Sequence, residues 1–234
     1  MDAVSTNPEG IPKAELMKLA EVFGHKPGIN LALFIASGAL LNKTTWTGED
    51  YSLHWLWVAG VNDEHLSIDE KIVGILHDVV EDSDWEIEDL EAMGFSSHIT
   101  EAVRSLTKIE NEKYLDAVKR CSYNPIGRKI KKRDNRHNMD LTRSRSAPTP
   151  KQKFLYPISY AFLNAVDNGE VAVGSSVWKF LQMDKYKELL SAENYNLVAS
   201  SVSEPVPASL KAVYGEPVLI AKKPRADGMV SAPA

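Results

Sequence analysis

The chain has 234 residues, 44% of them hydrophobic and 25% charged, which is ordinary for one soluble globular domain with appendages. Its net charge of −5 argues against a dedicated nucleic-acid-binding protein, and no apolar run is long enough to span a bilayer. The single cysteine, Cys121, excludes an internal disulfide and a cysteine-based zinc site, and with the polar N-terminus it predicts a cytoplasmic protein.

A polar arm and two helices are predicted at the start of the chain. Residues 1–11 are polar and contain Gly and Pro, which is typical of a loose arm. Residues 12–23 combine apolar side chains at helical spacing with a proline suited to a first turn, so we expect a short helix. Residues 30–41 are strongly apolar and predict a buried helix. The buried face predicted for the first helix consists of Leu16, Leu19, Ala20 and Phe23.

The next predicted helix runs from Tyr51 to Val58 and follows a turn at residues 47–49. It carries His54 directly before a Trp-Leu-Trp-Val run. A histidine among apolar residues is more often a hydrogen-bonded core residue than a metal ligand. His54 alone therefore does not predict a metal site.

A helix with a histidine-aspartate pair follows. Apolar residues recur at spacings of four, three and four, which predicts one buried face. Ser67 and Glu70 have the spacing of a capping box at its N-terminus. The predicted buried face consists of Ile68, Ile72, Ile75 and Val79.

Four ionisable residues interrupt the apolar pattern of this helix. On a continuous helix His77 would lie over Glu81, and Asp78 over Asp82, because residues four apart are neighbours. Buried carboxylates without partners are costly. These acids therefore either lie on a solvated helix end or are compensated by a cation. The His77-Asp78 dipeptide alone does not decide between these two interpretations.

Three helices are predicted between this pair and residue 121. The first covers residues 84–93, with Ser83 or Asp84 as its N-cap and Gly94 as its end. The others cover 99–106 and 114–121.

The helix predicted to begin at Pro125, with Asn124 as its N-cap, holds polar residues in its apolar stripe. At 100° per residue, Asp134 and His137 lie on the face where a hydrophobic residue is expected. A structural helix would rarely accept the desolvation cost of an acid there, so this position predicts a functional site. The apolar members of the stripe are Ile126, Ile130 and Leu141.

The rest of the chain predicts helices over residues 154–166 and 177–190. No segment has the alternation of a strand, so the predicted fold class is all-α. Residues 201–234 contain several prolines among Ala, Gly and Ser and predict a disordered, Pro-rich C-terminal tail.

Four stretches in one order resemble a known family. TGEDYSLH, LHDVVEDSD with EDLEAMGF behind it, EKY, and IKKRDNRHNM are similar to the hydrolase domain of RelA/SpoT-type alarmone enzymes and their small stand-alone relatives, in the HD phosphohydrolase superfamily. The similarity covers residues 31–145. It implies an HD-type helical bundle over residues 29–200, preceded by an arm and short helix over 1–28.

The resemblance implies that one metal ion, usually Mn²⁺ in this family, binds to His54, His77, Asp78 and Asp134. Imidazole and carboxylate ligands suit such a divalent ion. Glu81 and Asp82 match the family's catalytic acidic pair, which orients or deprotonates the attacking water. The implied reaction is hydrolysis of the 3′-pyrophosphate of guanosine tetra- or pentaphosphate to GDP or GTP and pyrophosphate.

The resemblance also implies substrate contacts. Asn138 matches a residue that contacts the nucleotide, and Lys131 matches a basic residue of the family. Tyr51 is expected beside the substrate. Tyr51 and His137 are both expected to support the residues that bind the metal and the substrate. Most of the other basic residues after Pro125 are expected to be solvated, because six of them cannot share one helical face.

One departure from the family's sequence pattern concerns the recognition of the nucleobase. Where the family has an Arg-Lys pair, this chain has Thr45 and Trp46, and Trp46 could offer a stacking surface instead. The alternatives are an HD phosphohydrolase acting on a deoxynucleoside triphosphate, a nucleoside monophosphate, NADPH or an adenine alarmone, or a non-catalytic nucleotide-binding or antitoxin-like protein. The expected partner is a small-molecule nucleotide, without membrane or nucleic acid, and homo-oligomerisation stays open.

Overall fold

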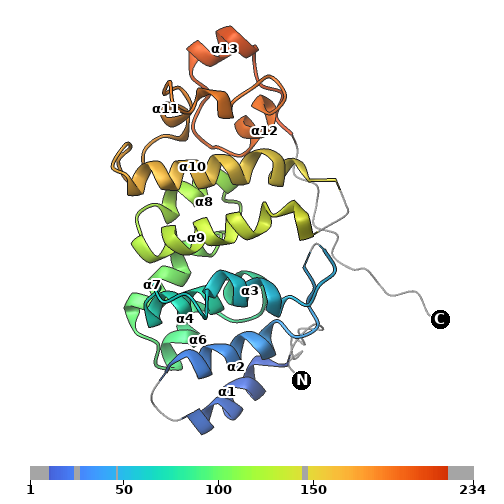
Figure 1. Cartoon of the computed structure of the whole chain (residues 1–234), viewed down its shortest axis with the longest axis vertical. Coiled ribbons are helices and arrows are strands. Elements are labelled where there is room, and N and C mark those ends of the chain that lie inside the picture. The colour runs from blue at the N-terminus through green and yellow to red at the C-terminus, as the bar shows by residue number, and fades with distance from the viewer. Residues whose placement is uncertain (1–10, 24–26, 46, 144–146, 221–234) are drawn as a thin grey trace, which may run out of the picture.

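The computed structural model describes residues 11–23, 27–45, 47–143 and 147–220, and these form an all-α structure (Figure 1). The described residues contain no β-strand, only an isolated antiparallel bridge between Thr44 and Asp50 before α3. The predicted fold class is confirmed. Within the same residues, no helix is both long and apolar enough to cross a membrane.

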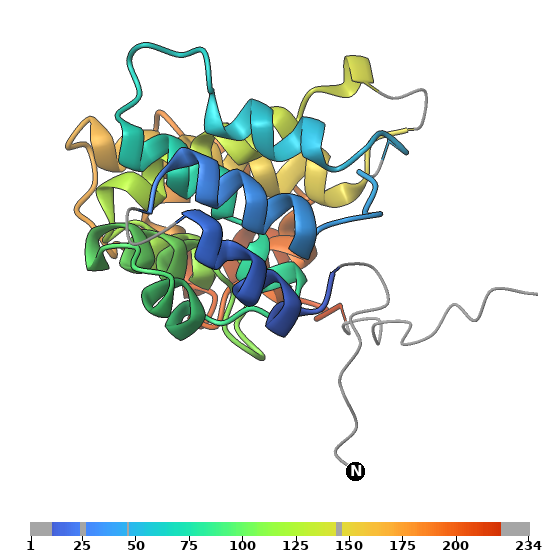
Figure 2. The same ribbon diagram turned by 90° about the horizontal axis from the view of Figure 1, so that it is seen from below.

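The helices are stacked along the long axis of the molecule, with α1 and α2 at one end (Figure 1). Figure 2, seen from below, shows these two helices side by side. The layers from that end are α1 (Lys13–Ala20) and α2 (Ile29–Ala39); then α3 (Ser52–Ala59), α4 (Ile68–Leu76), α5 (Val79–Asp82), α6 (Ile87–Ala92) and α7 (Ser97–Leu106); then α8 (Tyr114–Cys121), α9 (Pro125–Asn138) and α10 (Tyr156–Asp167); and last α11 (Val177–Leu181), α12 (Tyr195–Ser200) and α13 (Ala208–Tyr214). Short turns of 3-10 helix are Glu21–Phe23, Leu141–Arg143 and Lys187–Leu189, and Lys151–Leu155 is π-helical.

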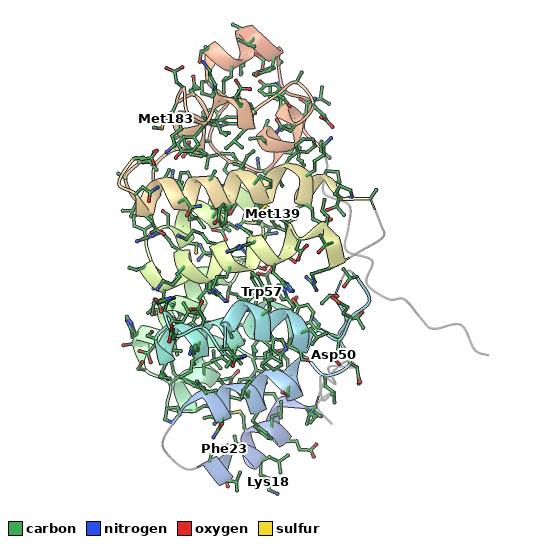
Figure 3. The ribbon with its side chains drawn as sticks, viewed as in Figure 1. Lys18, Phe23, Asp50, Trp57, Met139 and Met183 are labelled. Atoms are coloured by element: carbon green, nitrogen blue, oxygen red, sulfur yellow. The ribbon has the colours of Figure 1, made fainter. Side chains whose placement is uncertain are left out.

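Two hydrophobic clusters hold these layers together. The first is built from α1 to α7 and the apolar face of α9, and the second from α8 and α10 to α13. Burying such faces provides most of the stability of short helices. Figure 3 places Trp57 where α3 faces α9, and the guanidinium of Arg133 lies 5.5 Å from the centre of its ring.

Helix α4 begins as predicted and ends earlier than predicted. The Ser67 hydroxyl accepts from the backbone N–H of Glu70, whose carboxylate accepts from the backbone N–H of Ser67, so the capping box is confirmed. The helix stops at Leu76, and α5 starts after Asp78. The prediction of one continuous helix is wrong, because a turn at His77 and Asp78 interrupts it, and φ of −104° and ψ of −4° at Asp78 depart from regular helical values.

Helix α6 begins later than predicted. Its capping box is formed by Glu86 and Asp89, so the prediction of Ser83 or Asp84 as the N-cap is wrong. The indole of Trp85 is buried, and the chain turns to place it in the core before the helix can start.

Three predicted core positions lie at the surface. Leu19 is 49% exposed because α1 buries a narrower face, made of Leu16 and Ala20. Ile68 is 58% exposed because it starts α4 at the protein surface. Leu141 is likewise 42% exposed, since α9 ends before it and its 3-10 turn follows a different path.

The C-terminal prediction does not hold for residues 201–220. Helix α13 forms there, and Leu210 is buried in the second cluster together with Val202. The prolines at 205 and 207 precede α13, where proline does not interrupt helical hydrogen bonds. Residues 221–234 lie outside the described residues.

Candidate metal centre

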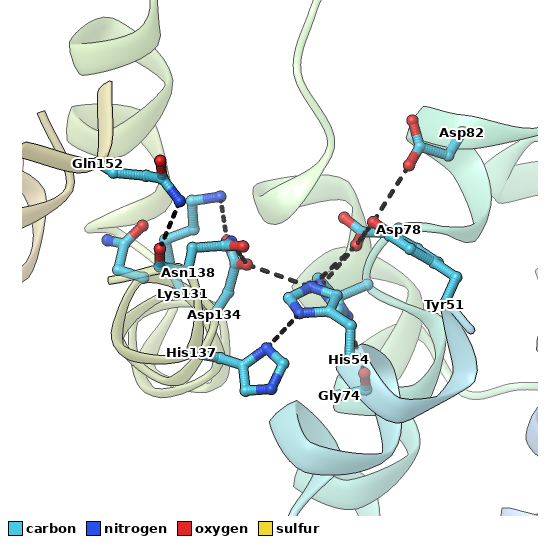
Figure 4. Close-up of polar contacts among 12 residues, drawn as sticks. Tyr51, His54, Gly74, Asp78, Asp82, Lys131, Asp134, His137, Asn138 and Gln152 are labelled. Atoms are coloured by element: carbon cyan, nitrogen blue, oxygen red, sulfur yellow. Dashed lines mark hydrogen bonds and ion pairs between the residues drawn. The ribbon is translucent and has the colours of Figure 1, made fainter. Parts of the chain in front are cut away.

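Three parts of the fold bring the four predicted metal ligands together (Figure 4). His54 comes from α3, His77 and Asp78 from the break between α4 and α5, and Asp134 from α9. Nε2 of His54 lies 3.4 Å from both Oδ2 of Asp78 and Oδ1 of Asp134. Nε2 of His77 lies 2.9 Å from Oδ2 of Asp78. Potential ligand atoms of His54, His77 and Asp134 all lie within 4.8 Å of one another.

The position of α9 is set by its cap and by one arginine. The Asn124 side chain accepts from the backbone N–H of Gly127, which confirms the predicted N-cap. Arg133 donates to the backbone oxygen of Val58 at 2.7 Å and pairs with Asp63 at 3.0 Å. These bonds tie α9 to the end of α3 and so fix Asp134 opposite His54.

The hydrogen bonds of His77 leave a lone pair facing the cluster. Nδ1 of His77 lies 2.8 Å from the carbonyl oxygen of Gly74, which can only accept, so Nδ1 carries the proton. In the neutral ring Nε2 is then an acceptor. This atom is buried and makes no hydrogen bond, although Asp78 is close. A lone pair that faces a carboxylate is unfavourable unless a cation or proton lies between them.

The same reasoning applies to His54. Arg143 donates to Nδ1 of His137 at 2.8 Å, which makes that atom an acceptor. Nδ1 of His54 lies 2.7 Å from it and must therefore donate. The second lone pair of the cluster, on Nε2 of His54, consequently points toward Asp78 and Asp134.

Both carboxylates are held in the ionised form. Lys131 donates to Oδ2 of Asp134 at 2.8 Å, and the Asn138 amide donates to Oδ1 at 2.5 Å. Burial raises the pKa of Asp134, but Lys131 and His54 outweigh it and lower that pKa. Burial also raises the pKa of Asp78, but the charge of His77 outweighs burial, so the pKa of Asp78 lies well below its usual value. The Tyr51 hydroxyl donates to Oδ2 of Asp78 at 2.6 Å.

The histidines differ in their affinity for protons. Burial lowers the pKa of His54, but the neighbouring carboxylates Asp134 and Asp78 raise it to about 9. Burial and the charges of His54 and Arg143 lower the pKa of His137 to about 4, which agrees with its role as an acceptor. A proton on His54 thus occupies the position that a metal cation would take.

This donor set fits a divalent metal ion. Two imidazole nitrogens and a carboxylate oxygen of Asp134 lie within 4.8 Å of one another, and Oδ2 of Asp78 lies close to both nitrogens. A cation among them would satisfy the unpaired Nε2 of His77. Mixed imidazole and carboxylate ligands suit divalent ions of intermediate hardness.

A cavity of about 230 Å³ opens onto the cluster. The predicted residues Tyr51, Glu81, Asp82, Lys131 and Asn138 line it together with three of the ligands. Trp46, predicted to stack on the substrate, lies outside the described residues. The cavity is also lined by Thr45, Arg143, Lys151 and Tyr156.

The two predicted catalytic acids have different surroundings. Burial and the charge of Asp78 raise the pKa of Asp82, whose Oδ2 lies 3.2 Å from the ammonium of Lys43. Glu81 is exposed, and its Oε2 accepts from the backbone N–H of Lys108 at 3.3 Å. Asp82 is therefore the more enclosed of these two acidic residues.

The other basic residues of α9 are largely paired, so their predicted solvated role is wrong. The acids that pair with them lie on neighbouring elements, and the bonds hold α9 in place. The pairs are Arg128–Asp167, Lys132–Asp167, Lys129–Glu70 and Arg133–Asp63.

Sequence reasoning missed three residues that line the cavity. Arg143 follows α9 in a separate turn, outside the helical periodicity. Lys151 and Tyr156 are five residues apart and meet because the turn between them is π-helical; the Lys151 ammonium lies 5.1 Å from the centre of the Tyr156 ring. The only sequence signal for these two residues is that a lysine and a tyrosine occur together in this stretch, which could have indicated that they line a polar cavity.

No protein-family model matches this chain. Membership of the HD phosphohydrolase superfamily thus stays a prediction from the resemblance of the sequence motifs.

Proposed function

We propose that this protein is a metal-dependent phosphohydrolase of small-molecule phosphates. The observation that carries the proposal is the grouping of His54, His77 and Asp134, with Asp78 beside both histidines, next to an open cavity lined by His54, Asp78 and Asp134. The same cavity contains the ammonium groups of Lys131 and Lys151, which complement a phosphate.

The roles follow from the surroundings of each residue. His54, His77, Asp78 and Asp134 would hold the ion, which when bound lowers the pKa of water and stabilises charge on phosphoryl oxygens. Asp82, with its raised pKa, accepts the proton of the attacking water, and Glu81 orients that water from the exposed side. Lys131 and Lys151 bind the phosphate, and Asn138 holds Asp134 while facing the substrate.

The resemblance makes the 3′-pyrophosphate of guanosine tetraphosphate the first substrate to test, with Mn²⁺ as the first metal. Thr45 lines the cavity at one of the two positions where the family has its Arg-Lys pair. Guanine recognition would therefore rest on other groups, and adenine alarmones and NADPH belong in the same assay.

The test is product analysis of the full chain with Mn²⁺ and each nucleotide, with and without chelator. Asp134→Asn is the inactive reference, and Glu88→Gln, at an exposed carboxylate on α6, is the matched control. Release of pyrophosphate or orthophosphate that is lost with chelator and in Asp134→Asn supports the proposal. Metal binding without turnover of any phosphate contradicts it and favours a binding protein.

A further inference from the structure

A second cavity, of about 380 Å³, lies beside the metal cavity. Three residues, Glu81, Lys131 and Lys151, line both cavities and so form the boundary between them. The volume is within the range of small-molecule sites. A ligand whose phosphate lies against these lysines can therefore extend into either cavity.

The second cavity has an apolar interior. It lies where the two hydrophobic clusters meet, and residues of both contribute to its wall. Its apolar lining consists of Leu106, Ala117, Val118, Leu155, Leu197 and Ile220. Covering such a surface with a hydrocarbon group removes it from water, which favours binding.

The polar side chains of the interior already have partners. Glu112 accepts two hydrogen bonds from Arg120, both at 2.8 Å. Three others donate to a backbone oxygen at 2.8 Å: Lys113 to Val202, Ser200 to Asn196, and Ser201 to Leu197. The Tyr114 hydroxyl donates to Asn135 at 3.0 Å. The edge of a nucleobase would find few free partners here, whereas a hydrocarbon group needs none.

Lysine side chains outnumber the one carboxylate, Glu81, at the boundary. The Lys151 ammonium lies 4.7 Å from the centre of the Tyr114 ring, and among the described residues no carboxylate pairs with it. Lys108 lines the cavity nearby, and its ammonium likewise pairs with no described acid. Two cations without acidic partners thus lie at the edge of an apolar interior.

We infer that the second cavity receives a hydrocarbon substituent attached to the phosphate of the substrate. The inference rests on the proposed phosphohydrolase site and narrows its substrates to phosphate esters with one apolar substituent. The phosphate lies between Lys131, Lys151 and Lys108, and the substituent contacts Leu106, Val118 and Leu197.

The test is calorimetric binding of n-alkyl monophosphates, from methyl to hexyl, to the full chain with Mn²⁺ and again with chelator. Affinity is expected to rise about fourfold per methylene, the factor for burying one CH₂ group. Ala117→Phe and Leu197→Phe fill the cavity from two helices and should remove this dependence while methyl phosphate binds as before. Val213→Phe, at a 70% exposed position on α13, is the matched control.

The outcomes separate this inference from the proposed function. A chain-length dependence that persists with chelator and is lost in both cavity-filling variants supports the inference even if no phosphate is hydrolysed. Equal affinity along the series overturns it, even if nucleotides are hydrolysed. Tighter binding of guanosine or adenosine monophosphate than of hexyl phosphate, abolished by Ala117→Phe, overturns it in favour of a nucleobase. Circular dichroism establishes that each variant is folded.

Discussion

Nδ1 of His54 lies 2.7 Å from Nδ1 of His137, and Arg143 donates to that same nitrogen of His137. Because an arginine cannot accept, the proton between the two imidazoles belongs to His54. In the neutral ring, the nitrogen that faces the carboxylates is thereby left with its lone pair. A residue that does not touch the cluster thus decides which tautomer its central histidine adopts.

Replacing Arg143 should weaken metal binding without unfolding the protein. In Arg143→Gln the constraint on His137 is lost, and His54 can carry its proton on the nitrogen needed for the metal. We expect the Mn²⁺ affinity to fall about 10- to 100-fold, the range found when groups that orient ligands are removed. Electron paramagnetic resonance of free Mn²⁺ measures this. Arg136→Gln, at an exposed position of α9, should bind as the unchanged protein does; equal affinity in both variants would refute the tautomer argument.

The metal-free protein should lose stability as the pH rises. The pKa of His54 is raised from 6.5 to about 9 in the folded state. The protonated His54 therefore stabilises the folded protein fully below pH 6.5, and this stabilisation is lost as the pH rises through 9. The loss is on the order of 3 kcal/mol of unfolding free energy. Urea unfolding with chelator from pH 6 to 9.5 tests this. In His54→Asn the unfolding free energy should fall less over this pH range. In the unchanged protein the Mn²⁺ affinity should rise over the same range, because the metal displaces the proton of His54.

The acidic pair should be needed for turnover and not for metal binding. In Asp82→Asn the side chain keeps its size but cannot accept a proton, so we expect kcat to fall about 10²- to 10⁴-fold. Glu81→Gln should have a smaller effect, because Glu81 is exposed. Mn²⁺ titration and turnover of the substrate found by product analysis are the two measurements. Undiminished kcat in Asp82→Asn would remove it from the role of base.

A packing change in the helix that carries His77 should also disturb the site. A Cβ at Gly74 would lie 2.5 Å from Cα of Ala59, where α4 crosses α3. Gly74→Ala must push these helices apart, and we expect a loss of about 1–3 kcal/mol of stability. His54 and His77 lie on the two displaced elements, so metal affinity should fall too. Gly28→Ala, whose Cβ would meet no atom within 4 Å, should change neither.

Local signals in the sequence predicted much of this fold. The Ser67–Glu70 capping box and the Asn124–Pro125 helix start depend on residues a few positions apart, so they could be predicted without tertiary information. The break at Asp78 could not, because the contacts that hold its carboxylate come from other helices. Helix α13 was missed because its stability comes from packing against the second cluster.

Some residues of the candidate site could also be predicted from the sequence, and others could not. Asp134 was noticed because an acid lay in an apolar stripe, and the structure buries it beside His54. Arg143 gave no comparable signal, since its contact with His137 depends on a turn outside any regular helix. The ion pairs of the α9 lysines were missed because their acidic partners lie far away in the sequence.

The π-helical turn Lys151–Leu155 has a consequence for how such a site can change over time. Five residues along a regular α-helix correspond to about 140° around the axis, whereas a π turn brings such residues into line. A π turn is an α-helix with one residue inserted. Deleting Lys153 would restore the regular helix and turn the Lys151 ammonium away from both cavities. A single codon insertion or deletion would therefore be sufficient to add or remove the cation that we propose binds the phosphate, without changing any of the four proposed metal ligands.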